Sequence, residues 1–252
     1  MKKILMCTAA ATMLAGSAFA DNGAYVGFGL GNTFANISNK TNASAYDVDT
    51  GKTEYHSFGN RRLKDKTGTT GKLYAGYEYE MQEFSLLFEG GYTLDTSEAE
   101  YGNETSGENN LELDGTPSSV GPDDSDPVIT SMKLKRNHIV SVGMGIKKEV
   151  AAKFSVMGGL DLLHSQFKFQ SKGTADYTTG VNSVVKKKSK FGLAPWVGMS
   201  WDAGIVEAGL RYQYSRYQQL KTGGDYTPNK FNIANKIKPE YHTIMVTISK
   251  KI

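Results

Sequence analysis

The chain contains one cysteine in 252 residues, Cys7, and this excludes a framework of disulfide bonds. Its stability must therefore come from packing or from closed networks of hydrogen bonds. After the first twenty residues no stretch approaches 18 consecutive apolar residues, so a membrane-spanning helix is excluded as well. No cluster of His, Cys, Asp and Glu has the spacing of metal ligands. We therefore expect neither a metal nor a cofactor.

The first twenty residues have the pattern of a secretory signal peptide. Lys2 and Lys3 supply a positive start, residues 4–15 an apolar core, and residues 18–20 a small-x-small cleavage site. The apolar segment is too short for a transmembrane anchor, which needs about 20 residues. Cleavage before Asp21 removes both lysines and Cys7, so the formal charge falls from +3 to +1. We expect a signal peptide at 1–20 and one domain at 21–252.

Eight segments of roughly ten residues or more follow, each with apolar residues at alternate positions. In residues 23–31, Phe28 and Leu30 share one face, whereas glycines occupy the other face. A period of two residues indicates a β-strand whose two faces meet different surroundings. The predicted strands are 23–31, 70–79, 83–93, 132–147, 153–169, 190–201, 205–217 and 240–252.

The connections between these strands are alternately short and long, and the long ones are 38–68, 95–131, 170–189 and 218–239. Short periplasmic turns and long external loops are typical of barrels in the bacterial outer membrane. A soluble sandwich or lipocalin-like barrel also alternates, but its solvent-facing surface would carry more charge than the glycines and small residues found here. The sequence therefore predicts an all-β, eight-stranded antiparallel up-and-down transmembrane β-barrel. We expect it in the cell outer membrane, with both termini periplasmic.

Three local features refine this prediction. Beyond His164 the apolar positions shift to Phe167 and Phe169, which indicates a bulge or a strand that leaves the bilayer. Pro195 cannot donate a ladder hydrogen bond, so we expect a bulge there. Aromatic residues near strand ends predict two interfacial girdles. They are Tyr79, Phe84, Phe154 and Trp201 at the inner side, and Tyr92, Phe191, Tyr214 and Tyr241 at the outer side.

The carboxyl-terminal segment 242–252, His-Thr-Ile-Met-Val-Thr-Ile-Ser-Lys-Lys-Ile, is similar to the closing strand of the opacity/OmpA-like family of eight-stranded outer-membrane proteins. That strand often begins with His and alternates apolar residues up to a terminal aromatic residue. The leader, the glycine-rich first strand and the number of strands agree with the family, whereas Ile252 departs from the usual terminal Phe. The resemblance implies a surface antigen, an adhesin or a structural, porin-like barrel that carries no transport.

Isolated charges lie on the inward face of the predicted strands. An eight-stranded barrel has an interior just wide enough for side chains to fill, and an unpaired charge there is costly. Counting from the short turns places Glu89 level with Arg211, and Lys72 level with Asp161. We predict a paired network that closes the lumen, with an ion or proton path as the alternative. Its members are Lys72, Glu78, Glu89, Asp161, Glu207 and Arg211.

No enzyme activity is expected. Barrels that deacylate lipid A would require a His-x-Ser pair on a lipid-facing strand, and the chain offers only His56-Ser57 and His164-Ser165. Adjacent residues of a strand point to opposite faces, so neither histidine reaches its neighbouring serine as a general base. His138 and His242 have ordinary explanations as polar loop or interface residues.

The predicted external loops differ in charge. Residues 95–127 contain no Lys or Arg, whereas Arg61, Arg62, Lys64 and Lys66 lie in the first loop and three lysines at 186–188 lie in the third. Runs of one sign can mark interaction surfaces. Three lysines make a small footprint for nucleic acid, and basic residues at that height would equally suit lipopolysaccharide phosphates. Solvated loops without a binding role are the alternative. The acidic residues are Asp95, Glu98, Glu100, Glu104, Glu108, Glu112, Asp114, Asp123, Asp124 and Asp126.

The sequence thus favours an outer-membrane surface protein, a structural barrel that displays extracellular loops for adhesion or antigenic interaction. The expected partners are outer-membrane lipid, lipopolysaccharide and, through the loops, a host-cell or envelope protein. The alternatives are a small gated porin-like channel and a lipid-modifying outer-membrane enzyme.

Overall fold

The computed structural model describes residues 23–46, 53–101, 128–174, 182–226 and 231–252, and the predicted signal peptide lies outside these ranges. Among the described residues no helix is long and apolar enough to cross a membrane. The strands are β1 Ala24–Tyr46, β2 Thr53–Lys66, β3 Gly68–Glu80, β4 Ser85–Asp95, β5 Glu98–Tyr101, β6 Val128–Ala151, β7 Phe154–Thr174, β8 Asn182–Asp202, β9 Glu207–Tyr217, β10 Leu220–Tyr226 and β11 Phe231–Lys251.

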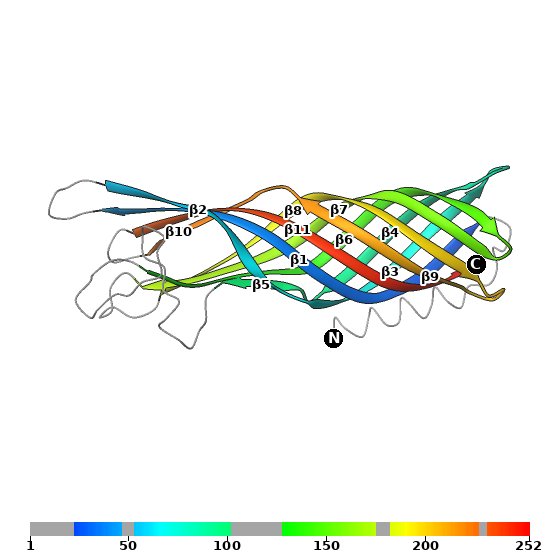
Figure 1. Ribbon diagram of the computed structural model, residues 1–252, viewed down its shortest axis with the longest axis horizontal. Helices are drawn as coiled ribbons and strands as arrows, with labels where there is room; N and C mark the ends of the chain where they lie inside the picture. The colour runs from blue at the N-terminus through cyan, green and yellow to red at the C-terminus, as the bar shows by residue number, and fades with distance from the viewer. Residues whose placement is uncertain (1–22, 47–52, 102–127, 175–181, 227–230) are drawn as a thin grey trace.

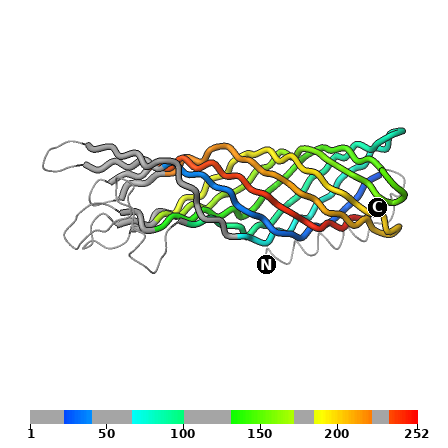
Figure 2. The backbone as a smooth tube through the Cα atoms, in the orientation of Figure 1, coloured from blue at the N-terminus to red at the C-terminus, as the bar shows by residue number. Residues whose placement is uncertain are grey.

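The strands close into a ring of eight. β2, β5 and β10 continue β3, β4 and β9 after short interruptions, and all pairings are antiparallel. β1 pairs with β3 on one side and with β11 on the other, which joins the two ends of the sheet. Figure 1 shows the resulting barrel, and Figure 2 shows its strands inclined to the long axis, as closure requires. The predicted eight-stranded antiparallel barrel is confirmed.

Three short turns lie at one end of the barrel. In the first, the Met81 N–H donates to the Phe84 carbonyl at 2.9 Å. The second contains Lys153 at a φ of 67°, and the third contains Gly204 at a φ of 90°, where a residue without Cβ is unstrained. The end of β11 lies with these turns, whereas β2, β5 and β10 extend toward the opposite end (Figure 1). The three short turns and the strands β2, β5 and β10 therefore lie at opposite ends of the barrel, as the alternation of short and long connections predicts.

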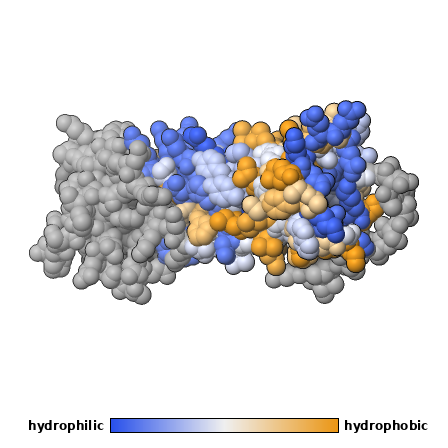
Figure 3. Space-filling view, turned by 45° about the vertical axis from the view of Figure 1, so that its right-hand side comes forward, coloured by the Kyte–Doolittle hydropathy of each residue, from blue (hydrophilic) through white to orange (hydrophobic). Residues whose placement is uncertain are grey.

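The outer wall near the turns is apolar. On β6, Val140, Val142 and Met144 are 53%, 62% and 64% exposed, and the side chain of Ser141 between them is buried. Figure 3 shows hydrophobic residues gathered between two hydrophilic zones on the face that it draws. A soluble barrel would present a polar outer wall instead, so the lipocalin-like alternative does not hold. The same exposure is found at the predicted outward positions Phe28, Leu30, Leu73, Phe88, Val156, Phe191, Val197, Leu210 and Val246.

The strands are longer than predicted. β6, β7, β8 and β11 contain 24, 21, 21 and 21 residues, about twice the 9–11 that cross a bilayer. The described parts of the predicted loops at 38–68, 95–131, 170–189 and 218–239 are therefore mainly strand. The reason is that the pattern inverts beyond the apolar band. Leu134 and Ile237 are buried inside, while Lys135 and Lys236 point outward, which suits a wall in water.

Two of the local predictions need correction. Pro195 pairs with Leu160 without any register shift, and only the pairing with β9 pauses at residues 194–195, because proline has no N–H to donate. Tyr241 does not join the outer girdle, since its side chain is fully buried inside the barrel.

The shift of apolar positions in β7 has a different cause from a bulge in that strand. β7 keeps its phase, and Phe167 and Phe169 point inward because the barrel interior is apolar above the band. The strand continues past the apolar band, which was the second of the two predicted explanations. A bulge lies in the partner strand β6, between Arg136 and Ile139.

Candidate functional site

A layer of four charged side chains crosses the lumen inside the apolar band. β3, β4, β7 and β9 each contribute one inward residue: Lys72, Glu89, Asp161 and Arg211. The Lys72 Nζ lies 2.5 Å from Glu89 Oε1 and 3.7 Å from Asp161 Oδ2. Arg211 donates to both carboxylates, at 2.8 Å each. All four side chains are at most 9% exposed, and their two positive and two negative charges balance. We name this set the central network.

Aromatic rings pack against the central network. The Trp196 indole N–H donates to Asp161 Oδ1 at 2.9 Å, and the Arg211 guanidinium carbon lies 3.9 Å from the centroid of the same ring. Small residues make room for this ring: a Cβ on Gly145 or Gly159 would lie 2.7 or 2.6 Å from its atoms. The alternation of glycines with apolar residues on these strands thus serves to admit large side chains into the lumen.

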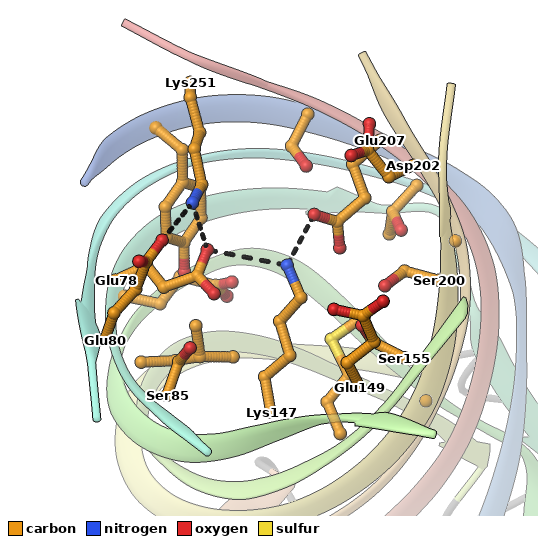
Figure 4. A pocket seen from close by; sticks show the side chains of 18 of the residues that line it. Glu78, Glu80, Ser85, Lys147, Glu149, Ser155, Ser200, Asp202, Glu207 and Lys251 are labelled. Atoms are coloured by element: carbon orange, nitrogen blue, oxygen red, sulfur yellow. Dashed lines mark hydrogen bonds and ion pairs between the residues drawn. The ribbon is translucent and has the colours of Figure 1, made fainter. Parts of the chain in front are cut away.

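A second set of charges lines the mouth at the turn end of the barrel. The Lys147 Nζ lies 2.6 Å from Glu207 and 3.5 Å from Glu78, and Lys251 pairs with Glu78 at 3.3 Å and with Glu80 at 3.0 Å. Figure 4 shows these residues around a cavity. The cavity has a volume of about 730 Å³, and its lining reaches inward to Glu89 and Arg211. Burial alone would lower the pKa of Lys251, but the hydrogen bond to Glu80 and the charge of Glu78 raise it.

A third layer closes the lumen beyond the apolar band. Arg136 is 2% exposed, forms an ion pair with Asp95, and lies 3.8 Å from the centroid of the Tyr241 ring. Its Nη1 donates to the Tyr217 hydroxyl at 3.2 Å, which also accepts from Ser165 at 2.8 Å. Burial alone would lower the pKa of Arg136, but Tyr217 and the Asp95 carboxylate hold it above its ordinary value. We name this set the upper plug.

An apolar cluster surrounds the upper plug, and the buried side chains in it are Ala35, Ile37, Ala99, Met132, Leu134, Ile139, Leu163, Phe167, Phe169, Ala194, Tyr217, Leu220, Ile237 and Tyr241. Between the upper plug and the central network remains a space of about 20 Å³, lined by Thr70, Ser141 and Gln213 among others. Such a volume holds about one water molecule. The described lumen is therefore filled by side chains over two consecutive layers.

The six predicted lumen charges fall into two groups. Lys72, Glu89, Asp161 and Arg211 come together in the central network, whereas Glu78 and Glu207 pair with Lys147 at the mouth. Sequence reasoning missed Lys147, Lys251 and Trp196, although each occupies an inward position of its strand. It also missed Arg136, which lies in phase with outward residues such as Val140 and is turned inward by the bulge.

The predicted acidic loop separates into three parts. Asp95 is no loop residue, because it is the last residue of β4 and its buried carboxylate accepts hydrogen bonds from Ser97 and Arg136. Glu98 and Glu100 lie on β5, within 3.6 and 3.7 Å of Lys133. The remaining seven lie outside the described residues: Glu104, Glu108, Glu112, Asp114, Asp123, Asp124 and Asp126.

The described histidine side chains face outward and contact aromatic rings. His138 Nδ1 lies 2.6 Å from the Tyr92 hydroxyl, and His242 Nδ1 lies 2.7 Å from that of Tyr212. His164 packs on Phe191 at a centroid distance of 5.0 Å, whereas Ser165 points into the lumen. In the described side chains no histidine is therefore placed to activate a serine, and no group of three or more His, Cys, Asp or Glu is placed to hold a metal.

No protein-family model and no curated protein matches the sequence. Among solved structures, the outer membrane protease OmpT from Escherichia coli is similar at 10% identity and a TM-score of 0.42, over 93% of this chain and 98% of that one. Neisserial surface protein A is similar at 14% identity and 0.39, over 87% and 97%. The attachment invasion locus protein Ail of Yersinia pestis is similar at 13% and 0.32, over 84% and 98%. At these values the likeness carries no functional argument, and the narrower opacity/OmpA-like resemblance stays a prediction.

Proposed function

We propose that the chain is a surface protein of the bacterial outer membrane, a closed structural barrel that holds its loops above the bilayer for adhesion or antigenic interaction. The observation that carries this proposal is the pair of filled layers in the lumen, the central network and the upper plug. A barrel whose lumen is filled at two levels is suited to presenting loops and not to the diffusion of solutes.

The apolar band supports the membrane placement. Closure pairs the backbone groups of the wall within the barrel, and this is required where no water reaches them. The short turns and the end of β11 lie at one end, so the ordinary orientation of such barrels puts them in the periplasm. The opposite end would then face the medium.

The height of the wall supports the display role. β7 continues for ten residues beyond His164, which is the last outward residue of its apolar face. At about 3.3 Å per residue and a tilt of about 40°, this extension rises roughly 25 Å above the band. Residues 102–127 follow at the outer end of β5, and they contain seven acidic residues and no basic one. A rigid wall that carries a charged loop is the usual division between scaffold and recognition.

Planar-bilayer recording tests the closed lumen. The wild type is expected to show no steady conductance, because two layers in series block it. Arg211→Ala or Arg136→Ala alone should show almost no conductance, since each leaves one layer intact. The double variant should show a measurable conductance. Heat-modifiable migration on a detergent gel checks that each variant is folded. A large, stable conductance from the wild type would refute the proposal in favour of a small gated channel.

Cell-binding assays test the display role. The comparison is between the intact protein and a variant in which residues 102–127 are replaced by a tight turn. Asp95 and residues 98–101 are kept, because they belong to the upper plug and to the wall. Binding through the acidic loop should be lost in the variant and should weaken with salt in the intact protein. Equal binding by both proteins at every ionic strength would contradict the acidic-loop mechanism.

A further inference from the structure

Three lysines stand directly opposite one another on the outer wall beyond the apolar band. Lys135 of β6 is the register partner of Lys168 of β7, and Lys168 is the register partner of Lys187 of β8. Leu134 and Phe167, the chain neighbours of Lys135 and Lys168, are buried, so these two lysines point away from the barrel. Lys187 is exposed and lies in phase with the outward residue Phe191, so it points away as well. We name Lys135, Lys168 and Lys187 the lysine row.

Like charges that face each other across antiparallel strands destabilise a sheet, because their Cβ atoms lie only about 4.5–5.5 Å apart. In the described part of the chain, no ion pair joins a carboxylate to any lysine of this row. Glu98, the register neighbour of Lys135 on β5, lies instead within 3.6 Å of Lys133. Lys168 and Lys187 therefore face each other with no carboxylate as register partner, whereas Lys135 has Glu98 opposite it on β5. An external anion would relieve the repulsion between neighbouring lysines of the row.

The position of the row indicates which anion this is. Lys168 and Lys187 each lie four residues beyond His164 and Phe191, the packed aromatic pair at the outer limit of the apolar wall. Aromatic side chains of this kind mark the level of lipid headgroups. Four strand residues rise roughly 10 Å at the usual tilt, and the flexible lysine stem lets the ammonium reach back toward that level.

We propose that the lysine row binds the phosphate groups of phosphorylated glycolipids in the outer leaflet. This inference rests on the outer-membrane placement described under the proposed function, but not on any role of the loops. One phosphate placed between two adjacent ammonium groups would neutralise the repulsion between them. The barrel would thereby hold a shell of tightly associated lipid on the face formed by β6, β7 and β8.

The chain contains a matched control for this proposal. Lys40, Lys236 and Lys221 form a second row of register partners on β1, β11 and β10. They lie six or seven residues beyond Phe34, His242 and Tyr214, and so stand farther from the apolar band. Replacing this second row removes the same charge from the same kind of position, but at a level where lipid phosphates are not expected.

The test compares the wild type with two triple variants, Lys135→Gln/Lys168→Gln/Lys187→Gln and Lys40→Gln/Lys221→Gln/Lys236→Gln. Each protein is folded in zwitterionic detergent and titrated with diphosphorylated lipid A. One lysine near an anionic lipid surface changes affinity roughly fivefold, so the first triple variant should lose on the order of a hundredfold. The second triple variant should retain affinity within a few-fold. Affinity of the wild type should fall as salt is raised.

Stability provides a second readout that does not depend on the titration. In vesicles of phosphatidylcholine alone, the first triple variant should unfold at equal or higher urea concentration than the wild type, because the repulsion is gone. In vesicles that contain lipid A, the order should reverse, because only the wild type gains from binding. A variant that merely damaged the wall would be less stable in both membranes.

Three results would overturn the proposal. The first is equal affinity of the wild type and the first triple variant for lipid A. The second is an equal loss in both triple variants, which would indicate general attraction by surface charge. The third is binding of a soluble sulfated polysaccharide to the row in preference to lipid A. None of these results depends on cell adhesion, so a failure here is distinguishable from a failure of the proposed display role.

Discussion

Arg211 is the residue whose removal tests the closed lumen most directly. Its guanidinium donates to Glu89 and Asp161 at 2.8 Å each and packs over the ring of Trp196. In Arg211→Ala, Lys72 would be the only cation left among the described residues of the central network. One negative charge would then lie uncompensated among side chains that are at most 9% exposed. The variant replaces a neutral layer by a charged one.

The expected cost follows from the burial. Removal of one partner of a buried ion pair costs about 3–5 kcal/mol, because the remaining charge loses its compensation. Loss of the stacked guanidinium adds to this cost. The cavity of about 730 Å³ at the mouth reaches Glu89, so in the variant water can enter and hydrate the Glu89 carboxylate. We therefore expect Arg211→Ala to lower the free energy of unfolding by about 3 kcal/mol, the lower end of the range.

Urea unfolding in lipid vesicles, followed by tryptophan fluorescence, measures this change. Asp161→Asn in the Arg211→Gln background restores a neutral layer of Lys72 and Glu89. The double variant should therefore lose about 2 kcal/mol less free energy of unfolding than the sum of the losses in Asp161→Asn and Arg211→Gln alone. Arg216→Ala is the control, because Arg216 is 66% exposed and lies 3.5 Å from Glu240. This substitution should lower the free energy of unfolding by less than about 1 kcal/mol. Strict additivity, or equal losses in Arg211→Ala and Arg216→Ala, would refute the reasoning.

Alternation accounts for most of what the sequence predicts. Once a strand is assigned, the face of each residue follows from its parity, and this places Glu89, Asp161 and Arg211 inside without any structure. The same parity places Lys147, Trp196 and Asp95 inside, so the inward orientation of these residues can be predicted from the sequence. The sequence predicts a loop at Asp95 because the predicted strand 83–93 ends where the outward apolar pattern stops, whereas β4 continues to Asp95.

The extension of the wall beyond the apolar band also has a sequence signal, in which the polar and apolar faces of the strand are exchanged. In Lys133-Leu134-Lys135, Phe167-Lys168-Phe169 and Lys236-Ile237-Lys238, apolar residues alternate with lysine. A strand with lipid outside and a strand with water outside both have a period of two, but with the polar and apolar faces exchanged. The pattern with apolar residues outward therefore ends at the level where the pattern with apolar residues inward begins.

Arg136 shows what parity cannot predict. The bulge between Arg136 and Ile139 adds one residue to β6 relative to β7, and this exchanges the two faces of β6 beyond it. Neither Asn137 nor His138 marks a bulge by composition. The joining of the four charges is a further step beyond parity, because relative depth depends on tilt and stagger, which a single strand does not encode.

Two further substitutions test how the lumen is filled. Gly143→Ala would place a Cβ 2.2 Å from Asp161 Oδ1 and should lower the free energy of unfolding by about 1–3 kcal/mol, whereas Gly90→Ala, with 4.0 Å to its nearest neighbour, should be neutral or slightly stabilising in the same urea titration. Arg136→Met should cost about 3–5 kcal/mol, because the fully buried Asp95 carboxylate loses its counter-charge. The apolar cluster around Arg136 provides a surrounding in which a methionine can pack. Adding Asp95→Asn removes the orphaned charge while keeping an acceptor for the Ser97 N–H, so the double variant should regain more than half of the loss. If the double variant is as unstable as Arg136→Met, the guanidinium stabilises the upper plug through its packing on Tyr241 and not through its charge.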